Sequence, residues 1–310
     1  MEQDAYFVYR KKEQGICIIR CYAKESRIVI PKEIEGLPVV EIASYAFAAQ
    51  MEEEPENPGE YPCICGDLLE ELVLPDTIQR IGRYVFYNCW NFRHFSFCSN
   101  IRFMGAGAFT GCKKLNRLTV REVGVEKSCL REVLVDLNHT VTVFGEGEQS
   151  YAALYPGFYE EAVENTPARI IETHTHGVGI QYRNAFKNTQ IDWDEYDRLF
   201  SIGKHNMELS EAVLTATYRL MTPTHLEEHS KEEYTQFLKG NIREAAELFL
   251  RLEENSLLRW LGDQFVQDAE ELEVILKAAQ GKVEAVSLLM DIAHRRFHSG
   301  NNKRKKGFSL

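Results

Sequence analysis

A 23-residue repeat in the first half of the chain constrains the fold more than any other feature. Residues of the same type recur at this spacing, as in the pairs Ile81 and Met104, Gly82 and Gly105, Phe86 and Phe109, and Cys89 and Cys112. A fixed period of this length predicts a stack of similar coils. One coil cannot cover its own apolar side, whereas a second coil placed on it buries both.

Apolar residues at the first, fourth and sixth positions of each copy predict a short strand, because alternate side chains of a strand face the same way. In three successive copies these positions are Leu69, Leu72 and Leu74, then Phe92, Phe95 and Phe97, then Leu115, Leu118 and Val120. An earlier copy places Ile28 and Ile30 in its strand, and its Phe47 corresponds to Phe86. We expect like residues of successive copies to lie over one another in one apolar column.

The pattern LxxLxLPxxIxxIGxxxFxxC, read from Leu69 to Cys89, resembles the BspA-type leucine-rich repeat of bacterial proteins. The likeness extends over about residues 28–120. It implies a solenoid whose surface binds another protein, without indicating which one. The segment FYEEAVENTPARI, residues 158–170, is similar to a region of other bacterial proteins that carry this repeat, and that likeness implies no activity.

The residues between the column positions should face outward from the stack. Together with an adjacent aromatic residue they form a candidate binding strip of Glu71, Val73, Tyr84, His94, Ser96, Arg117 and Thr119. One interpretation is an ordinary solvated face. The other is a contact strip for a polar partner, which nearby tyrosines favour because they supply rigid interface area.

The sequence predicts an α+β chain in which a short leucine-rich-repeat β-solenoid is followed by a small α+β linker and an α-helical array. We expect residues 1–150 to form the solenoid with its end caps, and an acidic loop near 50–62 to lie outside the coils. Residues 151–300 should hold the linker and then the helices. We expect a helix over 151–165 that restarts after Pro156, a strand or loose hairpin over 170–182, and a helical period from about Asp192 onward. The basic tail, 301–310, should be disordered.

Composition narrows the class of partner. The formal net charge of −11 disfavours a general affinity for nucleic acid or anionic lipid, because the mean field repels phosphate. The four basic residues of 303–306 would bind nucleic acid only weakly. No stretch reads as a signal peptide or a membrane span, so we expect a cytoplasmic protein. The eight cysteines are expected to be reduced structural thiols.

No constellation of residues indicates catalysis or a cofactor. His225 and His229 have zinc-ligand spacing, but Leu226 stands where a metalloprotease has its glutamate. His174 and His176 would share a strand face without a third ligand. The glycines of GAGAFTG, residues 105–111, follow the repeat period and do not indicate a phosphate loop. We therefore expect no enzyme, no metal and no cofactor. The alternative is an enzyme or ligand binder whose site lies at the junction around 155–182.

Overall fold

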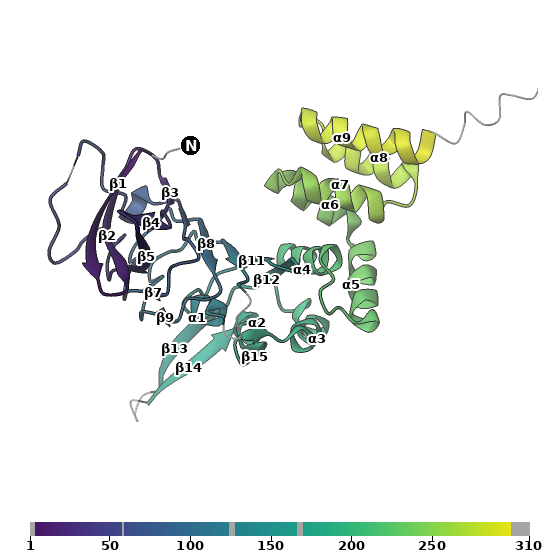
Figure 1. Ribbon diagram of the computed structural model, residues 1–310. Coiled ribbons are helices and arrows are strands. Elements are labelled where there is room, and N and C mark those ends of the chain that lie inside the picture. The colour runs from purple at the N-terminus through teal and green to yellow at the C-terminus, as the bar shows by residue number, and fades with distance from the viewer. Residues whose placement is uncertain (1–3, 58, 124–127, 166–169, 299–310) are drawn as a thin grey trace, which may run out of the picture. The chain divides into compact units, whose positions relative to one another are not determined.

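The computed structural model describes residues 4–57, 59–123, 128–165 and 170–298. Its elements form a β-solenoid in the N-terminal part and a helical region after it, which confirms the predicted fold class (Figure 1). The chain divides into two compact units, one of residues 1–207 with 222–226 and one of residues 208–221 with 227–310. Residue 150, near which we expected the domain junction, lies within the first unit.

Sheet 2 is one of the two six-stranded sheets of the solenoid. Its strands are, in order across the sheet, β3 (Arg27–Val29), β6 (Glu71–Val73), β8 (His94–Cys98), β10 (Arg117–Arg121), β11 (Val141–Glu146) and β12 (Tyr151–Tyr155). Neighbours run parallel except for β11 and β12. The register pairs Leu72 with Phe95 and Phe95 with Leu118, and all three are fully buried. The 23-residue period is therefore one turn of the solenoid.

Sheet 1 forms the second stack. Its strands are β1 (Ala5–Lys12), β2 (Gly15–Ala23), β5 (Leu37–Ile42), β7 (Arg80–Ile81) and β9 (Phe103–Met104), with β4 (Glu33–Ile34) paired to β5 alone. The antiparallel hairpin of β1 and β2 begins the stack, and β2 then pairs in parallel with β5. A short 3-10 helix, η1 (Gly66–Leu68), lies in the turn before β6. The hairpin covers the first turn, so the N-terminal end of sheet 1 is closed by the chain itself.

The core between the sheets is a column of matching side chains. The rings of Phe47 and Phe86 lie 5.7 Å apart between centroids, and those of Phe86 and Phe109 lie 5.2 Å apart. Glycine is required beside this column because a Cβ at Gly105 would lie 2.2 Å from the backbone nitrogen of Arg83 in the preceding turn. Successive turns thus touch backbone to backbone at this point, which explains the glycine-rich segment without a phosphate site.

The C-terminal end of the solenoid is covered by α1 (Leu130–Val135), α2 (Gly179–Asn184) and α3 (Trp193–Gly203). Tyr155 of β12 and Tyr182 of α2 both contact the ring of Tyr196 edge-on, and all three side chains are buried. Their contacts extend the apolar core beyond the last repeat. The predicted helix start near Asp192 is confirmed, because the Asp192 carboxylate accepts a hydrogen bond from the Glu195 amide and caps α3.

The helix expected after Pro156 is wrong. Residues 151–155 form β12 instead, and the segment after Pro156 forms β13 (Tyr159–Asn165), which pairs antiparallel with β14 (Ile170–His176). Backbone pairing of β12 with β11 overrides the local helical pattern. The strand expected over 170–182 ends at His176, and α2 follows. A second small hairpin joins β15 (Phe186–Lys187) and β16 (Gln190–Ile191).

The second unit is helical in the residues that the structure describes. Its elements are α4 (Leu209–Met221), α5 (Glu228–Gly240), α6 (Ile242–Leu252), α7 (Asn255–Gln264), α8 (Ala269–Ala278), α9 (Val283–Ala293) and the π-helical η2 (His294–His298). The helix α4 packs against α5, α6 against α7, and α9 against both α7 and α8. Among the described residues, no helix has the length and apolar character needed to cross a membrane. The basic run 303–306 and the tail 301–310 lie outside the described residues.

The acidic segment of 50–62 has no helix or strand in its described residues, 50–57 and 59–62. It is attached to β2 at two points. The Glu54 carboxylate forms an ion pair of 2.5 Å with the buried Arg20, and the Tyr22 hydroxyl donates to the Pro55 carbonyl oxygen at 3.2 Å. The segment therefore lies along the outside of β2.

Candidate functional site

The register of sheet 2 places three residues of the candidate strip in one row. Glu71 of β6 lies beside His94 of β8, which lies beside Arg117 of β10. The same row continues to Arg27 of β3 and Thr142 of β11. Because residues opposite one another in neighbouring strands share a face, these side chains form a continuous line across five strands.

A second row runs parallel to the first, two residues further along each strand. Val73, Ser96 and Thr119 occupy it, and Phe144 of β11 extends it. Ser96 and Thr119 are nearly inaccessible, at 7% and 8% exposure, although they point away from the core. The larger neighbours in the first row cover them: the His94 Nε2 atom lies at hydrogen-bond distance, 2.9 Å, from the Thr119 Oγ1 atom. Ser96 and Thr119 consequently support the surface and add little contact area.

Charges along the strip partly neutralise each other. The carboxylate of Glu71 lies 3.3 Å from the Arg27 Nε atom and 3.8 Å from the His94 Nδ1 atom. Burial, together with the positive charge of Arg117, lowers the pKa of His94, which favours its neutral form. The guanidinium of Arg117 lies 4.5 Å from the centroid of the Phe144 ring. Among the described residues, no acidic side chain pairs with Arg117.

Tyr84 does not lie with the other six strip residues. It occupies the turn after β7, where its ring stacks on Tyr45 at 5.6 Å between centroids and meets Tyr87 edge-on. A backbone φ of 50° holds Tyr84 in the left-handed region. The structure therefore divides the predicted residues into a strip on sheet 2 and a separate tyrosine ladder on the turns.

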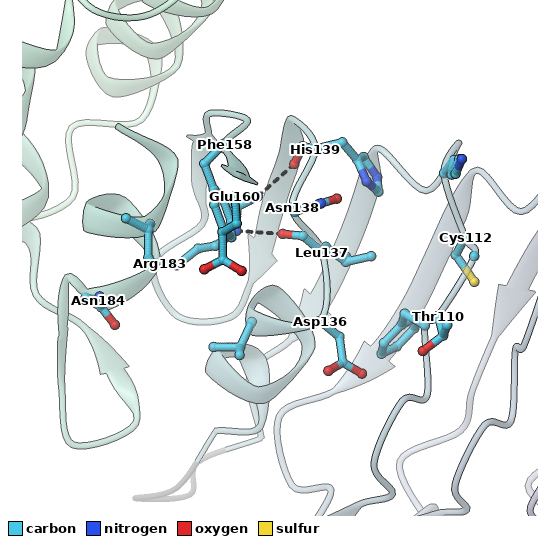
Figure 2. Close-up of a pocket in the computed structure, with 15 residues that line it drawn as sticks. Thr110, Cys112, Asp136, Leu137, Asn138, His139, Phe158, Glu160, Arg183 and Asn184 are labelled. Carbon is cyan, nitrogen blue, oxygen red and sulfur yellow. Dashed lines mark hydrogen bonds between the residues drawn. The ribbon is translucent and has the colours of Figure 1, made fainter. Parts of the chain in front are cut away.

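A pocket of about 790 Å³ lies where the solenoid ends, between its last turn and the segments that cover it (Figure 2). The last turn contributes residues 109–113, and the end of α1 with the loop after it contributes 135–139. The opposite wall is formed by Phe158, Glu160, Ile180, Arg183 and Asn184. Part of this lining falls within the junction of 155–182 that the sequence indicated. His174 and His176 are not among the lining residues.

Asp136 completes a ladder of backbone hydrogen bonds at the floor of this pocket. In earlier turns the amide of Phe47 donates to the Val85 carbonyl oxygen, and the amide of Phe86 to the Ala108 carbonyl oxygen. At Phe109 the Asp136 carboxylate takes the place of that carbonyl and accepts a backbone hydrogen bond. Packing around the carboxyl raises the pKa of Asp136, and these backbone bonds oppose the rise. Asp136 thus supplies the acceptor that a further turn of the solenoid would otherwise provide.

The guanidinium of Arg183 is engaged in hydrogen bonds within the protein. Its guanidinium donates to the backbone carbonyl oxygens of Leu134 (3.1 Å), Leu137 (2.7 Å), Pro156 (2.5 Å), Gly179 (3.0 Å) and His139 (2.7 Å). The side chain is 2% exposed and also lies over the Phe158 ring. In Figure 2 the labelled Arg183 lies behind Glu160. It holds the wall of the pocket together and has little freedom to bind a ligand.

The comparison with protein families agrees with the repeat seen in the structure. A family model described as a BspA type leucine rich repeat region matches residues 61–130. Residues 61–130 are a BspA-type leucine-rich repeat region. The strands β6, β8 and β10, the close contact at Gly105, and the stacked rings of Phe86 and Phe109 lie inside that region.

Two solved structures are similar to part of this chain. One is a leucine rich cell surface protein from Faecalibacterium prausnitzii A2-165, with 18% identity over 39% of this chain and 37% of that chain, and a TM-score of 0.26. The other is a leucine rich repeat protein of T. pallidum, with 22% identity over 37% of this chain and 68% of that chain, and a TM-score of 0.24. The match thus spans less than half of the F. prausnitzii protein. No curated protein sequence matches the chain.

The histidines considered as metal ligands lie in segments that do not contribute to the strip on sheet 2. His174 and His176 are on β14, where each lies within 3.6 Å of a glutamate oxygen, from Glu172 and Glu161 respectively. His225 lies in a turn with a φ of 49°, and His229 lies in the first turn of α5. Within the described residues, no group of three or more histidine, cysteine or acidic side chains is placed to hold a metal ion.

Sequence reasoning missed both ends of the strip on sheet 2. Arg27 was available from the earlier copy, since it precedes Ile28 as Glu71 precedes Leu72. Thr142 and Phe144 lie in β11, where the period has stopped, and only the pairing with β10 reveals them. The alternation of apolar and polar residues in VTVF, 141–144, is the signal that could have indicated their outward direction.

Proposed function

We propose that the protein is a non-catalytic scaffold that binds another protein through the outer face of sheet 2. The repeat family supports an interaction role. The flat double row on five neighbouring strands supports this particular surface, because side chains held at fixed strand spacings form a pre-organised contact area.

The proposal rests on the exposure and the contacts of the Arg117 side chain. Its guanidinium is exposed, lies against the Phe144 ring, and has no acidic partner among the described residues. An arginine held on an aromatic face is pre-organised for bidentate contact with a carboxylate. The partner should therefore present an acidic side chain at this point, and a basic group toward Glu71 would fit beside it.

A reducing compartment such as the cytoplasm is the proposed location. All eight cysteines are free thiols, and six of them are buried within the fold. Stable free thiols in this number are typical of compartments that keep cysteine reduced.

The test places a photo-crosslinking amino acid at Thr142, next to Arg117 in the register, in the full chain within its native cell. We expect a covalent adduct with one protein. Arg117→Glu should abolish the adduct because it places like charge against the partner's carboxylate. The matched control is Arg198→Glu, an exposed arginine on α3 outside the strip, which should leave the adduct unchanged. Equal yields from Arg117→Glu and wild type would refute the proposal.

The pocket of Figure 2 supports a second candidate function, the binding of a small polar ligand. Its volume of about 790 Å³ lies in the range of ligand sites, and its wall offers both the Glu160 carboxylate and the amide groups of Asn138 and Asn184. Thr110→Trp would fill it from the exposed side. Native mass spectrometry should find a small molecule retained by the wild-type chain and lost from this variant. An unliganded mass for the wild type would remove this candidate.

A further inference from the structure

The segment from Pro62 to Cys65 runs beside β2 like an additional strand. The amide of Ala23 donates to the Pro62 carbonyl oxygen at 3.2 Å, and the amide of Ile64 donates to the Cys21 carbonyl oxygen at 2.9 Å. Between these bonds, Tyr22 and Cys63 form an antiparallel bridge. Because side chains alternate along an extended chain, Ile64 enters the core at 2% exposure, while Cys63 and Cys65 share the opposite face and are only partly buried.

These two thiols differ from the other six, which are buried. The side chains of Cys63 and Cys65 are close enough to hydrogen-bond to one another. Their backbone is extended, with φ −149° and ψ 163° at Cys65. Two residues of extended chain separate Cα atoms by about 7 Å, at or beyond the roughly 4.4–6.8 Å of disulfides. The geometry therefore disfavours a direct sulfur–sulfur bond between these two residues.

A fixed positive charge lies next to the pair. The antiparallel register that places Cys63 opposite Tyr22 places Cys65 opposite Arg20, on the same face of β2. The Arg20 side chain is 0% exposed. It donates to the carbonyl oxygens of Ala46 at 3.1 Å and Ala48 at 2.7 Å, and to the Glu54 carboxylate. Its Nε atom is buried without an acceptor among the described residues.

We propose that Cys63 and Cys65 form a two-thiolate site for a soft monovalent cation, Cu(I). Thiolates are soft ligands that select Cu(I) over harder ions. Binding releases the two thiol protons and forms two copper–sulfur bonds, with no change of oxidation state. The resulting unit of one Cu⁺ and two thiolates carries a net charge of −1, and the Arg20 guanidinium beside it would neutralise that charge.

The surroundings favour Cu(I) over zinc. A structural zinc site needs four protein ligands and a catalytic one three. Within the described residues no third histidine, cysteine or acidic side chain is placed to join the two thiols. The carboxylate of Glu54 should weaken copper binding. It already pairs with Arg20 and so competes with the copper-bound thiolates for the same positive charge.

The test is an oxygen-free titration of the full chain with Cu(I) against a chromophoric Cu(I) chelator. We expect one equivalent to bind tightly to the wild type. Cys63→Ser and Cys65→Ser should each remove this binding, and Cys98→Ala, which alters a buried thiol of sheet 2, should retain it. Glu54→Gln should tighten binding by about tenfold, as expected for a change in the groups around a metal site. X-ray absorption should show two sulfur ligands.

Three results would overturn the proposal. Unchanged copper binding in Cys65→Ser would place the ion elsewhere. A Glu54→Gln variant that binds copper more weakly would assign the carboxylate a ligand role in place of competition for Arg20. Equal affinity for Zn²⁺ in the same competition would contradict a two-thiolate site. Circular dichroism of each serine variant checks that the fold is intact, which the partial exposure of both cysteines leads us to expect.

Discussion

The Cys112 thiol donates a hydrogen bond of 3.1 Å to the carbonyl oxygen of Phe86, one turn before it. Cys89 makes the same bond to the Phe47 carbonyl oxygen at 3.2 Å. The cysteines of the repeat are thus buried donors that connect successive turns, in addition to filling small spaces in the core. The two cysteines recur at the repeat period because each bonds to the equivalent carbonyl oxygen of the preceding turn.

Phe86→Ala and Phe109→Ala should each lower the free energy of unfolding by about 3–5 kcal/mol, because each leaves a cavity in the buried column. Urea denaturation monitored by circular dichroism measures this. Trp90→Ala is the matched control, since that ring is 47% exposed, and its cost should stay under about 1 kcal/mol. Losses of similar size at Trp90 and Phe86 would contradict the stacking.

Gly105→Ala should destabilise the protein by about 3 kcal/mol, because the new methyl group meets the backbone of the preceding turn at 2.2 Å. Gly240→Ala provides the opposite case. Nothing lies within 4 Å of a Cβ at Gly240, the last residue of α5, so alanine should stabilise by about 0.5–1 kcal/mol. Thermal unfolding of both variants decides whether close approach or conformational freedom makes glycine necessary at position 105.

Arg183→Met should cost at least about 3 kcal/mol, because it removes the hydrogen bonds of a buried guanidinium to five backbone carbonyl oxygens. The comparison is Arg198→Met, which removes only an exposed i,i+3 ion pair and should change stability by less than about 0.5 kcal/mol. Denaturant midpoints are the measurement. If Arg183→Met unfolds at the wild-type midpoint, the five bonds do not hold the end of the solenoid.

Stability should fall as the pH rises above about 8.5, the ordinary pKa of a thiol in an unfolded chain. Burial raises the pKa of Cys17 to about 11 and the pKa values of Cys21 and Cys112 to about 12. Below about pH 8.5 both states keep these protons, so the full stability is present. At higher pH only the unfolded state releases them, and stability is lost progressively up to the folded pKa values.

The slope should be about 1.4 kcal/mol per pH unit for each such thiol. Urea midpoints between about pH 8 and about pH 10 measure it. The double variant Cys21→Ala, Cys112→Ala should show a flatter decline than the wild type, because two of the titrating groups are gone. Parallel curves for the two proteins would show that other groups cause the alkaline loss.

Alkylation with iodoacetamide should modify Cys63 and Cys65 alone in the native protein, because these two thiols are accessible and the other six are buried. Mass spectrometry of the intact chain should therefore show two added groups before unfolding and eight after it. Rapid labelling of Cys17 or Cys129 under native conditions would show that the solenoid opens on the timescale of the reaction.

The solenoid was predictable from the repeat, because each turn places apolar residues at the same positions of the sequence. Leu72, Phe95 and Leu118 could be placed in one column from their spacing alone, and the register confirms it. Where the period stops, at β11 and β12, the local pattern of residues 151–155 favoured a helix, and only the pairing with a strand from another segment decides the outcome.

The candidate sites were less predictable for a similar reason. The sequence indicated that Glu71, His94 and Arg117 share a face, but not that Phe144 lies beneath Arg117, since that contact depends on where β11 pairs. Tyr84 was grouped with the strip because it is close in sequence, whereas the turn carries it to a different surface. Nothing in the spacing of Cys63 and Cys65 indicates Arg20 as a neighbour, because Arg20 comes from a strand some forty residues earlier.

The carboxylate of Asp136 at the last rung has a consequence for contacts between molecules. Backbone amides left unpaired at the end of a solenoid can donate hydrogen bonds to a second copy of the chain. Repetition of that contact would assemble the molecules into fibres. The Asp136 carboxylate already accepts the hydrogen bond of the Phe109 amide, so the carbonyl oxygen of a second copy would have to displace it. At this rung the row of amides is completed within one chain, on the same end of the solenoid that α1, α2 and α3 cover.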